Sequence, residues 1–207
     1  ARHWQERANL LTPIAKAFAT DVGVDVASIG VQVHGGMGYI EETGAAALLR
    51  DARIAPIYEG TNGIQAIDLV TRKLPLSGGE HVKGYIGELR ADIDALRKSN
   101  AEGFGATAER CDAALADLAE ATDFLQRALA DGRQEEALAG ATPYLRLFAL
   151  AAGGAYLVRG ALAGEDKARV ALARFFAENL VDEASALKRR VIDGAESLVS
   201  ADAALAS

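Results

Sequence analysis

Apolar side chains recur every three or four residues along most of this chain, and that spacing predicts helices that each bury one face. The first stripe is expected on one long helix that begins at Thr12 and Pro13, a capping residue followed by a first-turn proline. Gly35 and Gly36 are expected to end this helix in a left-handed turn. The stripe consists of Ile14, Phe18, Val22, Val26, Ile29 and Val33. Because signals for β-strands are nearly absent, the sequence predicts an all-α fold.

Four or five amphipathic helices are predicted in the second half of the chain. One that opens at Thr142 and Pro143 is apolar on nearly all sides as far as Arg159, so we expect it to lie at the centre. The others carry stripes within residues 86–96, 111–129, 165–181 and 185–204. Helices of this kind, joined by short connections, bury their apolar faces most simply as an antiparallel bundle.

A segment rich in glycine and proline, residues 74–84, separates these helices from the first part of the chain. Such turn-forming composition indicates a boundary. We therefore predict two units, residues 1–75 and residues 76–207. The chain starts at Ala1 without a methionine and enters helix-forming sequence at once, so we expect it to be part of a longer protein.

Composition narrows the range of functions. There are 22 Lys and Arg residues against 29 Asp and Glu, and the net charge of −7 argues against a nucleic-acid partner. The single cysteine, Cys111, fits a reducing compartment, and we expect a cytoplasmic location. No apolar run reaches the roughly 18 residues that indicate a membrane span, and the longest candidate, residues 147–158, is too short. The three histidines are far apart in sequence, so no metal site is expected.

An irregular stretch, residues 33–65, interrupts the helices. A short helix is expected over residues 45–51, and residues 54–60 should be extended, because a residue before proline is biased away from helix. Thr61 or Asn62 can cap a further helix, which the next proline would end. That helix carries Ile64, Ile67, Val70 and Leu74.

The motif HGGMGY could bring backbone N–H groups close to a phosphate through Gly35, Gly36 and Gly38. It does not match GxGxxG and it follows a predicted helix instead of a strand, so it lacks the context of a dinucleotide-binding fingerprint. Taken alone, a turn that ends a helix is the favoured interpretation.

The motif YEGTN places Glu59 on a predicted loop between two helices. In an apolar cleft the proton affinity of such a carboxylate rises, and the group becomes a usable base near neutral pH. The alternative is an exposed turn glutamate whose charge stabilises the N-terminus of the next helix. The residues alone favour this alternative.

Several segments of the irregular stretch resemble flavin-dependent acyl-CoA dehydrogenases. QVHGGMGYIEE, RDARIAPIYEGTNGIQ and EGTNGIQAIDL agree with that family in order and spacing, densely over residues 10–75 and weakly afterwards. The last segment and the helices behind it resemble larger bacterial members with a C-terminal extension, including 3-methylmercaptopropionyl-CoA dehydrogenase-like proteins. The resemblance implies that residues 1–75 are part of the family's C-terminal helical domain and that residues 76–207 are the extension.

The resemblance also implies a reaction. Members of this family use FAD to oxidise the α,β bond of an acyl-CoA to a trans-2-enoyl-CoA, and the electrons pass to an electron-transfer flavoprotein. Glu59 would be the catalytic base that removes the α-proton, and its backbone N–H would help to polarise the thioester carbonyl. Tyr58 and Gly60 would line the acyl-CoA site.

Cofactor contacts follow from the same resemblance. Gln32 and Gly36 would meet the adenosine-pyrophosphate end of an FAD held mainly by a neighbouring subunit, so a homo-oligomer is expected. Thr61 would contact the phosphate or adenine side of FAD. The family often has glutamine two residues after this threonine, where the chain has Gly63, so that contact is lost or replaced by backbone.

Two other interpretations stay open. The chain, and residues 80–207 above all, could be a helical assembly module for dimerisation or for covering a cleft, with no chemistry of its own. The fold could also persist with altered chemistry, although the retained YEGT motif weighs against this. Because most of the flavin site would lie in other parts of a longer protein, we expect the isolated chain to be colourless and inactive.

Overall fold

The computed structural model describes residues 1–99, 101–164 and 166–205, and within them the chain is helical, without a β-strand. The all-α prediction is confirmed. The longer helices are α1 (Arg2–Val33), α3 (Ala45–Ile54), α5 (Glu80–Ser99), α6 (Thr107–Ala130), α8 (Ala141–Leu162), α9 (Lys167–Asn179) and α10 (Ala184–Leu205). The shorter ones are α2 (Gly36–Tyr39), α4 (Asn62–Asp68) and α7 (Gln134–Ala139). Residue 165, where one helix was expected to begin, lies outside the described residues.

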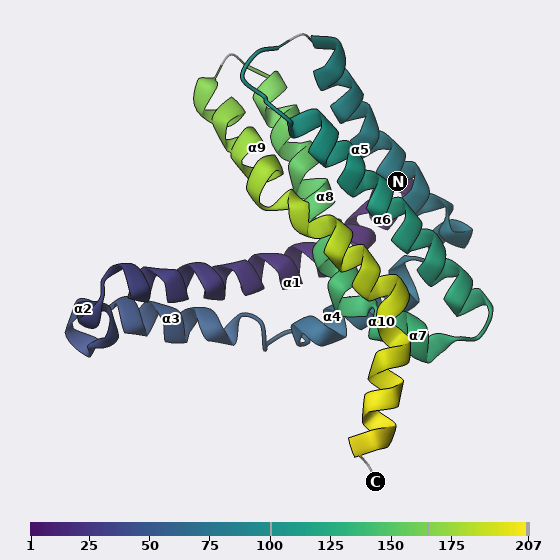
Figure 1. Cartoon of the computed structure of the whole chain (residues 1–207), viewed down its shortest axis with the longest axis horizontal. Coiled ribbons are helices and arrows are strands. Elements are labelled where there is room, and N and C mark those ends of the chain that lie inside the picture. The colour runs from purple at the N-terminus through teal and green to yellow at the C-terminus, as the bar shows by residue number, and fades with distance from the viewer. Residues whose placement is uncertain (100, 165, 206–207) are drawn as a thin grey trace.

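Helix α8 is the centre of a bundle that it forms with α5, α6, α9 and α10 (Figure 1). It packs against all four of these helices and also against α1 and α4. Apolar and small residues occupy nearly all of its faces, which explains the central position; its fully buried residues include Tyr144, Leu147, Phe148, Ala151, Ala155 and Val158. The predicted bundle with this helix at its centre is confirmed.

The apolar run at residues 147–158 was judged too short to span a membrane, but the whole of α8 is long and apolar enough to do so by length and composition alone. However, 61% of its most apolar window is buried inside the fold. The core helix of a bundle passes the same test, because it too is apolar on most of its faces.

Helices α1 and α3 lie side by side and project from the bundle as an arm, with α2 at its tip (Figure 1). The inner half of α1 belongs to the hydrophobic core through Leu10, Ile14 and Ala17. Two paired helices cover only one face of each other, so the predicted stripe becomes exposed farther along the arm. The residues of the stripe that are more than half exposed are Val26, Ile29 and Val33.

The predicted start of the first helix is wrong, because α1 begins at Arg2 and not at Thr12. Thr12 lies inside the helix, where its hydroxyl donates to the carbonyl oxygen of Ala8 at 2.7 Å. Pro13 cannot donate a helical hydrogen bond, but it is buried in the fold. At the other end α1 stops before the glycine pair, as predicted, and the φ of Gly35 is positive at +62°. Its ψ of −145° differs from that of the left-handed helical turn that was expected. Gly36 is instead the first residue of α2.

Residues 54–60 are not extended as predicted. Helix α3 continues to Ile54, and a turn follows in which the N–H groups of Ile57 and Tyr58 both donate to the Ile54 carbonyl. Ala55 has helical angles, φ −62° and ψ −38°, although it precedes a proline. The bias against helix before proline is therefore overridden here by the turn that closes α3.

Helix α4 begins as predicted, since the hydroxyl oxygen of Thr61 accepts a hydrogen bond from the N–H of Ile64 at 3.4 Å. Its buried face differs from the predicted one, because both Ile64 and Ile67 are exposed. A π-helical turn, Leu69–Lys73, follows α4 and changes the helical register behind it. The buried residues of this region are Ala66, Leu69, Val70 and Leu74.

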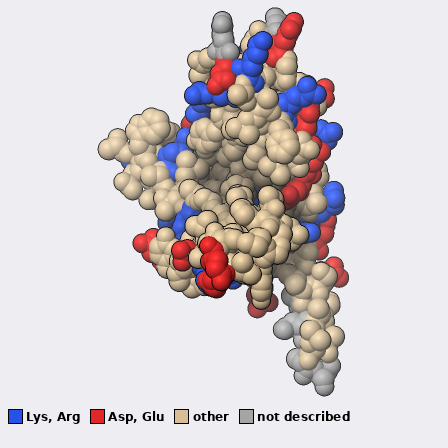
Figure 2. Space-filling view, turned by 90° about the vertical axis from the view of Figure 1, so that its left-hand side faces the viewer, with Lys and Arg blue, Asp and Glu red and all other residues tan. Residues whose placement is uncertain are grey.

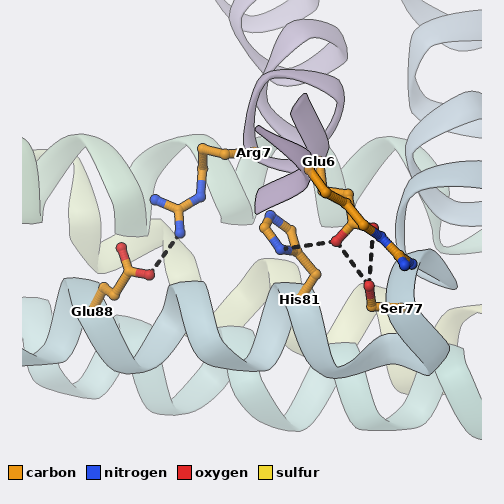
Figure 3. A network of polar contacts seen from close by, with 6 residues as sticks. Glu6, Arg7, Ser77, His81 and Glu88 are labelled. Carbon is orange, nitrogen blue, oxygen red and sulfur yellow. Dashed lines mark hydrogen bonds and ion pairs between the residues drawn. The ribbon is translucent and has the colours of Figure 1, made fainter. Parts of the chain in front are cut away.

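A polar network fixes the first turns of α1 to α5 (Figure 3). The Glu6 carboxylate accepts hydrogen bonds from Ser77 Oγ at 2.8 and 3.0 Å and lies 3.5 Å from Nδ1 of His81. Arg7 donates to Glu88 at 2.7 Å. These contacts join the two sides of the predicted boundary, and both sides contribute to one hydrophobic core. The division into residues 1–75 and 76–207 stays a prediction.

Candidate functional site

The loop between α3 and α4 has left-handed backbone angles at two consecutive residues. Glu59 has a φ of +54° and Gly60 a φ of +83°. Glycine adopts such angles freely, but the side chain of Glu59 makes the left-handed conformation unfavourable by about 1–2 kcal/mol. Contacts with the surrounding helices must therefore stabilise the loop.

Two side chains hold the carbonyl groups of these residues. Lys16 of α1 donates from Nζ to the carbonyl oxygen of Gly60 at 2.8 Å. Gln65 of α4 donates from Nε2 to the carbonyl oxygen of Glu59 at 3.0 Å. The peptide units that follow Glu59 and Gly60 are thus fixed in direction by the helices on either side.

Asn62 joins the start of α4 to α1. Its Oδ1 accepts a hydrogen bond from Lys16 Nζ at 2.8 Å. Its Nδ2 lies 3.1 Å from the Ala17 carbonyl oxygen, 3.0 Å from Thr20 Oγ1 and 2.7 Å from Asp21 Oδ1. Because an amide nitrogen has two hydrogens, these three acceptors share them. The base of the loop is therefore tied to about one turn of α1.

The groups of Glu59 that could do chemistry are free. Among the described residues its carboxylate has no hydrogen-bond or ion-pair partner, and its backbone N–H has no acceptor. The side chain is exposed, as are its loop neighbours Ile57 and Tyr58. The apolar cleft that a base requires would therefore need walls from outside this chain.

The residues predicted to contact a flavin lie in two separate places. Thr61 lies at the base of the arm, directly after the Glu59 loop. Gln32 lies near the tip, sixteen residues beyond Lys16 on α1, which is about 24 Å at 1.5 Å per residue. Gly36 begins α2 at the tip itself. The chain does not gather these residues into one compact site.

Each of the three residues still has a group suited to an extended, phosphate-bearing ligand such as FAD. The oxygen of Thr61 accepts the N–H of Ile64, which leaves the hydroxyl hydrogen available. The Gln32 side chain is exposed, and a Cβ at Gly36 would meet nothing within 4 Å. In contrast, the N–H of Gly38 already donates to the Gly35 carbonyl at 2.9 Å. Over the described part of the chain, no group of three or more His, Cys, Asp or Glu residues could hold a metal ion.

Sequence reasoning missed Lys16, Thr20 and Gln65. Each is an ordinary polar residue on a predicted helix, and the contact between Lys16 and Gly60 joins positions 44 apart. The one local signal is the i, i+4 spacing of Lys16 and Thr20, which places both on the same face of α1. Nothing local indicates that this face meets the Glu59 loop.

Two family models match the chain. One, described as "Acyl-CoA dehydrogenase, C-terminal domain", matches residues 2–74. The other, described as "Acetyl-CoA dehydrogenase C-terminal like", matches residues 85–202, which is more than half of the chain.

Curated proteins of similar sequence carry related names. The 3-methylmercaptopropionyl-CoA dehydrogenase of Ruegeria pomeroyi is 40% identical over 211 residues, which cover 95% of this chain and 35% of that protein. The short-chain-specific acyl-CoA dehydrogenase of Megasphaera elsdenii is 52% identical over 52 residues, 25% of this chain and 14% of that protein.

A solved structure has the same fold. The crystal structure of Caenorhabditis elegans ACDH-11 in complex with C11-CoA matches with a TM-score of 0.67 and 23% identity, over 93% of this chain and 34% of that one. The chain therefore spans about a third of the length of the Ruegeria and Caenorhabditis proteins.

Proposed function

Since the chain belongs to the acyl-CoA dehydrogenase family, we propose that it is the base-bearing helical part of an enzyme that oxidises an acyl-CoA thioester to a trans-2-enoyl-CoA. Glu59 is the catalytic base, and Tyr58 and Gly60 line the acyl-CoA site. One observation carries the proposal: helices on both sides hold the backbone of Glu59, while its carboxylate and N–H stay free among the described residues.

In this reaction the Glu59 carboxylate takes a proton from the carbon next to the thioester carbonyl. That proton is only weakly acidic, so the carbonyl oxygen needs a hydrogen-bond donor as negative charge develops on it. The free N–H of Glu59 is the donor that this loop offers. The chemistry that FAD supplies when bound is acceptance of the β-hydrogen as hydride, while the electron pair left on the α-carbon forms the double bond. Gly60, without a side chain, leaves room for the thioester beside the base.

We further propose that Gln32, Gly36 and Thr61 contact FAD. Thr61 donates its hydroxyl hydrogen on the phosphate or adenine side, at the base of the arm. Gln32 and Gly36 reach the adenosine-pyrophosphate end of an FAD held by a second copy of the protein. The rise of about 24 Å along α1 from Lys16, which contacts the loop before Thr61, to Gln32 supports contacts with two cofactor molecules in a homo-oligomer. The electrons then pass to an electron-transfer flavoprotein, and the protein is expected in the cytoplasm.

The second candidate function is assembly, and the surface of the arm favours it. Figure 2 looks onto the tip of the arm, and residues other than Lys, Arg, Asp and Glu cover most of the central area. The large apolar residues exposed on α2, α3 and their connection are Met37, Tyr39, Ile40, Leu48 and Ile54. In this function the chain serves dimerisation, with a second copy seated on the arm. Sedimentation of the isolated chain tests it, because a monomer at every concentration contradicts self-association.

The substitution Glu59→Gln in the full-length protein tests the catalytic proposal. We expect a folded, yellow protein whose flavin is no longer bleached by acyl-CoA, because an amide cannot accept the α-proton. Glu135→Gln, which changes an exposed glutamate of α7, serves as the control and should leave bleaching intact. Turnover of Glu59→Gln with an acyl-CoA and an artificial electron acceptor would remove Glu59 from the base role. A panel of acyl-CoA substrates would then identify the preferred chain.

A further inference from the structure

We propose that Lys16 is a positioning residue, which acts with Gln65 to hold the Glu59 loop in the conformation that aims the base at its substrate. The inference rests on the proposed role of Glu59 as the base. It begins from the 2.8 Å contact of the Lys16 ammonium with the carbonyl oxygen of Gly60, which crosses from α1 to the loop.

The loop needs this support because its own backbone provides little. The N–H of Tyr58 donates to the Ile54 carbonyl at 3.2 Å, and the next backbone bond in chain order runs from Asn62 to Pro56 at 3.1 Å. In between, within the described chain, the N–H groups of residues 59–61 have no backbone acceptor. Gly60 adopts either sign of φ at similar free energy, so the backbone does not select the observed conformation by itself.

Lys16 is well suited to select it. The residue is half-buried, and both hydrogen bonds of its ammonium go to this region, one to the Gly60 carbonyl and one to Asn62 Oδ1, each at 2.8 Å. It forms no ion pair with any described residue, and the carboxylate of Asp21 on the same helix binds Asn62 at 2.7 Å instead. A charged donor binds a carbonyl roughly twice as strongly as a neutral one. The lysine therefore acts on the loop backbone and is not drawn away by a carboxylate.

Gln65 completes the arrangement from the other side. Its Nε2 donates to the Glu59 carbonyl, and a Cβ added at Gly60 would lie 3.2 Å from the same nitrogen. The glutamine amide thus packs against the glycine as well as binding the glutamate. Loss of either side chain frees one of the two peptide units that orient Glu59.

A displaced base should slow the chemical step more than it weakens substrate binding. A misplacement of about 1 Å in a reacting group costs on the order of 100-fold in rate. The Nζ of Lys16 also lies 5.9 Å from the centre of the Tyr58 ring, so some loss of binding is expected. Because most of an acyl-CoA molecule would be bound outside this loop, we expect the half-saturating concentration to change much less than the rate. A large fall in the maximal rate with a small change in half-saturating concentration distinguishes a positioning role from a general loss of structure.

The test uses Lys16→Met in the full-length, flavin-loaded protein and follows flavin reduction after mixing with acyl-CoA. We expect the maximal rate to fall about 100-fold, with little change in half-saturating concentration or flavin content. Lys16→Arg keeps a charged donor and should restore most of the rate. The matched control is Lys83→Met, because the Nζ of Lys83 pairs with Asp123 at 3.0 Å on the bundle surface. This control should keep the wild-type rate.

Comparison with Glu59→Gln separates the two proposals. Normal turnover by Glu59→Gln overturns the base role itself, whatever Lys16→Met does. An inactive Glu59→Gln together with a wild-type rate in Lys16→Met overturns the positioning role and leaves the base role standing. An equally slow Lys16→Arg also overturns it, since that variant retains the donor.

If Lys16→Met does not fold or loses its flavin, Gln65→Met tests the proposed holding of the Glu59 loop instead. This variant removes the hydrogen bond to the Glu59 carbonyl and leaves α1 unchanged. The loss of one such bond should slow flavin reduction about tenfold. A wild-type rate in Gln65→Met overturns the proposed holding of the loop.

Discussion

Gly38 packs against Val31 so closely that a side chain does not fit between them. A Cβ at position 38 would lie 2.3 Å from the carbonyl oxygen of Val31 and 2.8 Å from the Cβ of His34. Two residues earlier, a Cβ at Gly36 would meet nothing within 4 Å. The turn from α1 into α2 therefore depends on glycine at one position and tolerates a side chain at the other.

We expect Gly38→Ala to loosen the tip of the arm, because the backbone must shift to relieve the contact with Val31. Overpacking of this kind costs about 1–3 kcal/mol. Hydrogen exchange at the amides of residues 30–44 measures the effect, which should be at least about tenfold faster exchange through local opening. Gly36→Ala is the matched control and should exchange as the unmodified chain does. Equal protection in the two variants contradicts the structural role of Gly38.

Helix faces were predicted correctly on α5 and α6, which pack against each other and against α8. The stripe of α5 through Leu89 and Ile93 and that of α6 through Leu115 and Leu118 are buried, as their spacing indicated. Apolar residues at helical spacing are buried when neighbouring helices cover the apolar face. The central position of α8 was predictable for the same reason, because it has almost no polar face.

Periodicity does not indicate what covers an apolar face, and this limited the prediction for the arm. Val26 and Ile29 fit the stripe of α1 and are nevertheless exposed, and Ile64 of α4 is exposed as well. The candidate site was predictable only in part. Glu59 is identified by its motif, whereas the contact from Lys16 depends on the fold bringing two distant segments together.

The buried hydroxyl groups of Thr122 and Tyr144 make different contributions to stability. Thr122 Oγ1 donates to the Leu118 carbonyl at 2.7 Å, so its hydrogen is used. The Tyr144 hydroxyl, 2.7 Å away, must then donate to Thr122. Thr122→Val would leave the phenol buried without a partner, whereas Tyr144→Phe would leave Thr122 bonded to Leu118.

We therefore expect Thr122→Val to lower the free energy of unfolding by about 2 kcal/mol and Tyr144→Phe by about 1 kcal/mol. Urea denaturation monitored by circular dichroism measures both values, with the slope against urea concentration unchanged. Each variant is the control for the other, because both remove the same hydrogen bond. A larger loss in Tyr144→Phe than in Thr122→Val would show that the donor has been assigned the wrong way round.

The stability of the chain should fall as the pH is lowered below neutrality, and His81 is the main cause above pH 5. Burial between α1 and α5 lowers the pKa of His81 below its ordinary value of 6.5, and the charge of Arg7 and the nearby His3 act in the same direction. The carboxylates of Glu6 and Glu88 oppose this shift with smaller effects. The folded state therefore favours the neutral imidazole. The resulting stability is complete above about pH 6.5 and is lost as the pH falls toward the lowered pKa.

His81→Gln tests this dependence, because it removes the titrating group from the network. The free energy of unfolding of this variant, measured by urea denaturation, should change less between pH 7 and pH 5.5 than that of the unmodified chain. His34→Gln, at the exposed end of α1, is the control and should retain the original dependence. Identical pH dependence in the His81 variant and the unmodified chain would exclude His81 as the cause.

Hydrogen bonds from Arg2 to Glu6 and from Arg7 to Glu88 lower the pKa values of these two glutamates, so a further loss of stability should follow below about pH 4.5 in all three proteins.

The isolated chain should purify without bound flavin and without acyl-CoA dehydrogenase activity. Its proposed FAD contacts are Gln32 and Gly36 at the tip of the arm and Thr61 at the base, and all three are exposed. Gln32 lies about 24 Å along α1 from Lys16, which contacts the loop before Thr61. Three exposed contacts cannot enclose an isoalloxazine ring, which hydride acceptance would require, and they cannot exclude water from Glu59, which proton abstraction requires. An absorption spectrum recorded after incubation with excess FAD and gel filtration measures occupancy, and reduction of an artificial acceptor by acyl-CoA measures activity. The full-length protein, treated in the same way, is the positive control. Near-stoichiometric flavin on the isolated chain would contradict this prediction. It would mean that the helical arm forms a cofactor site by itself, most readily by pairing two copies, without residues from the rest of a longer protein.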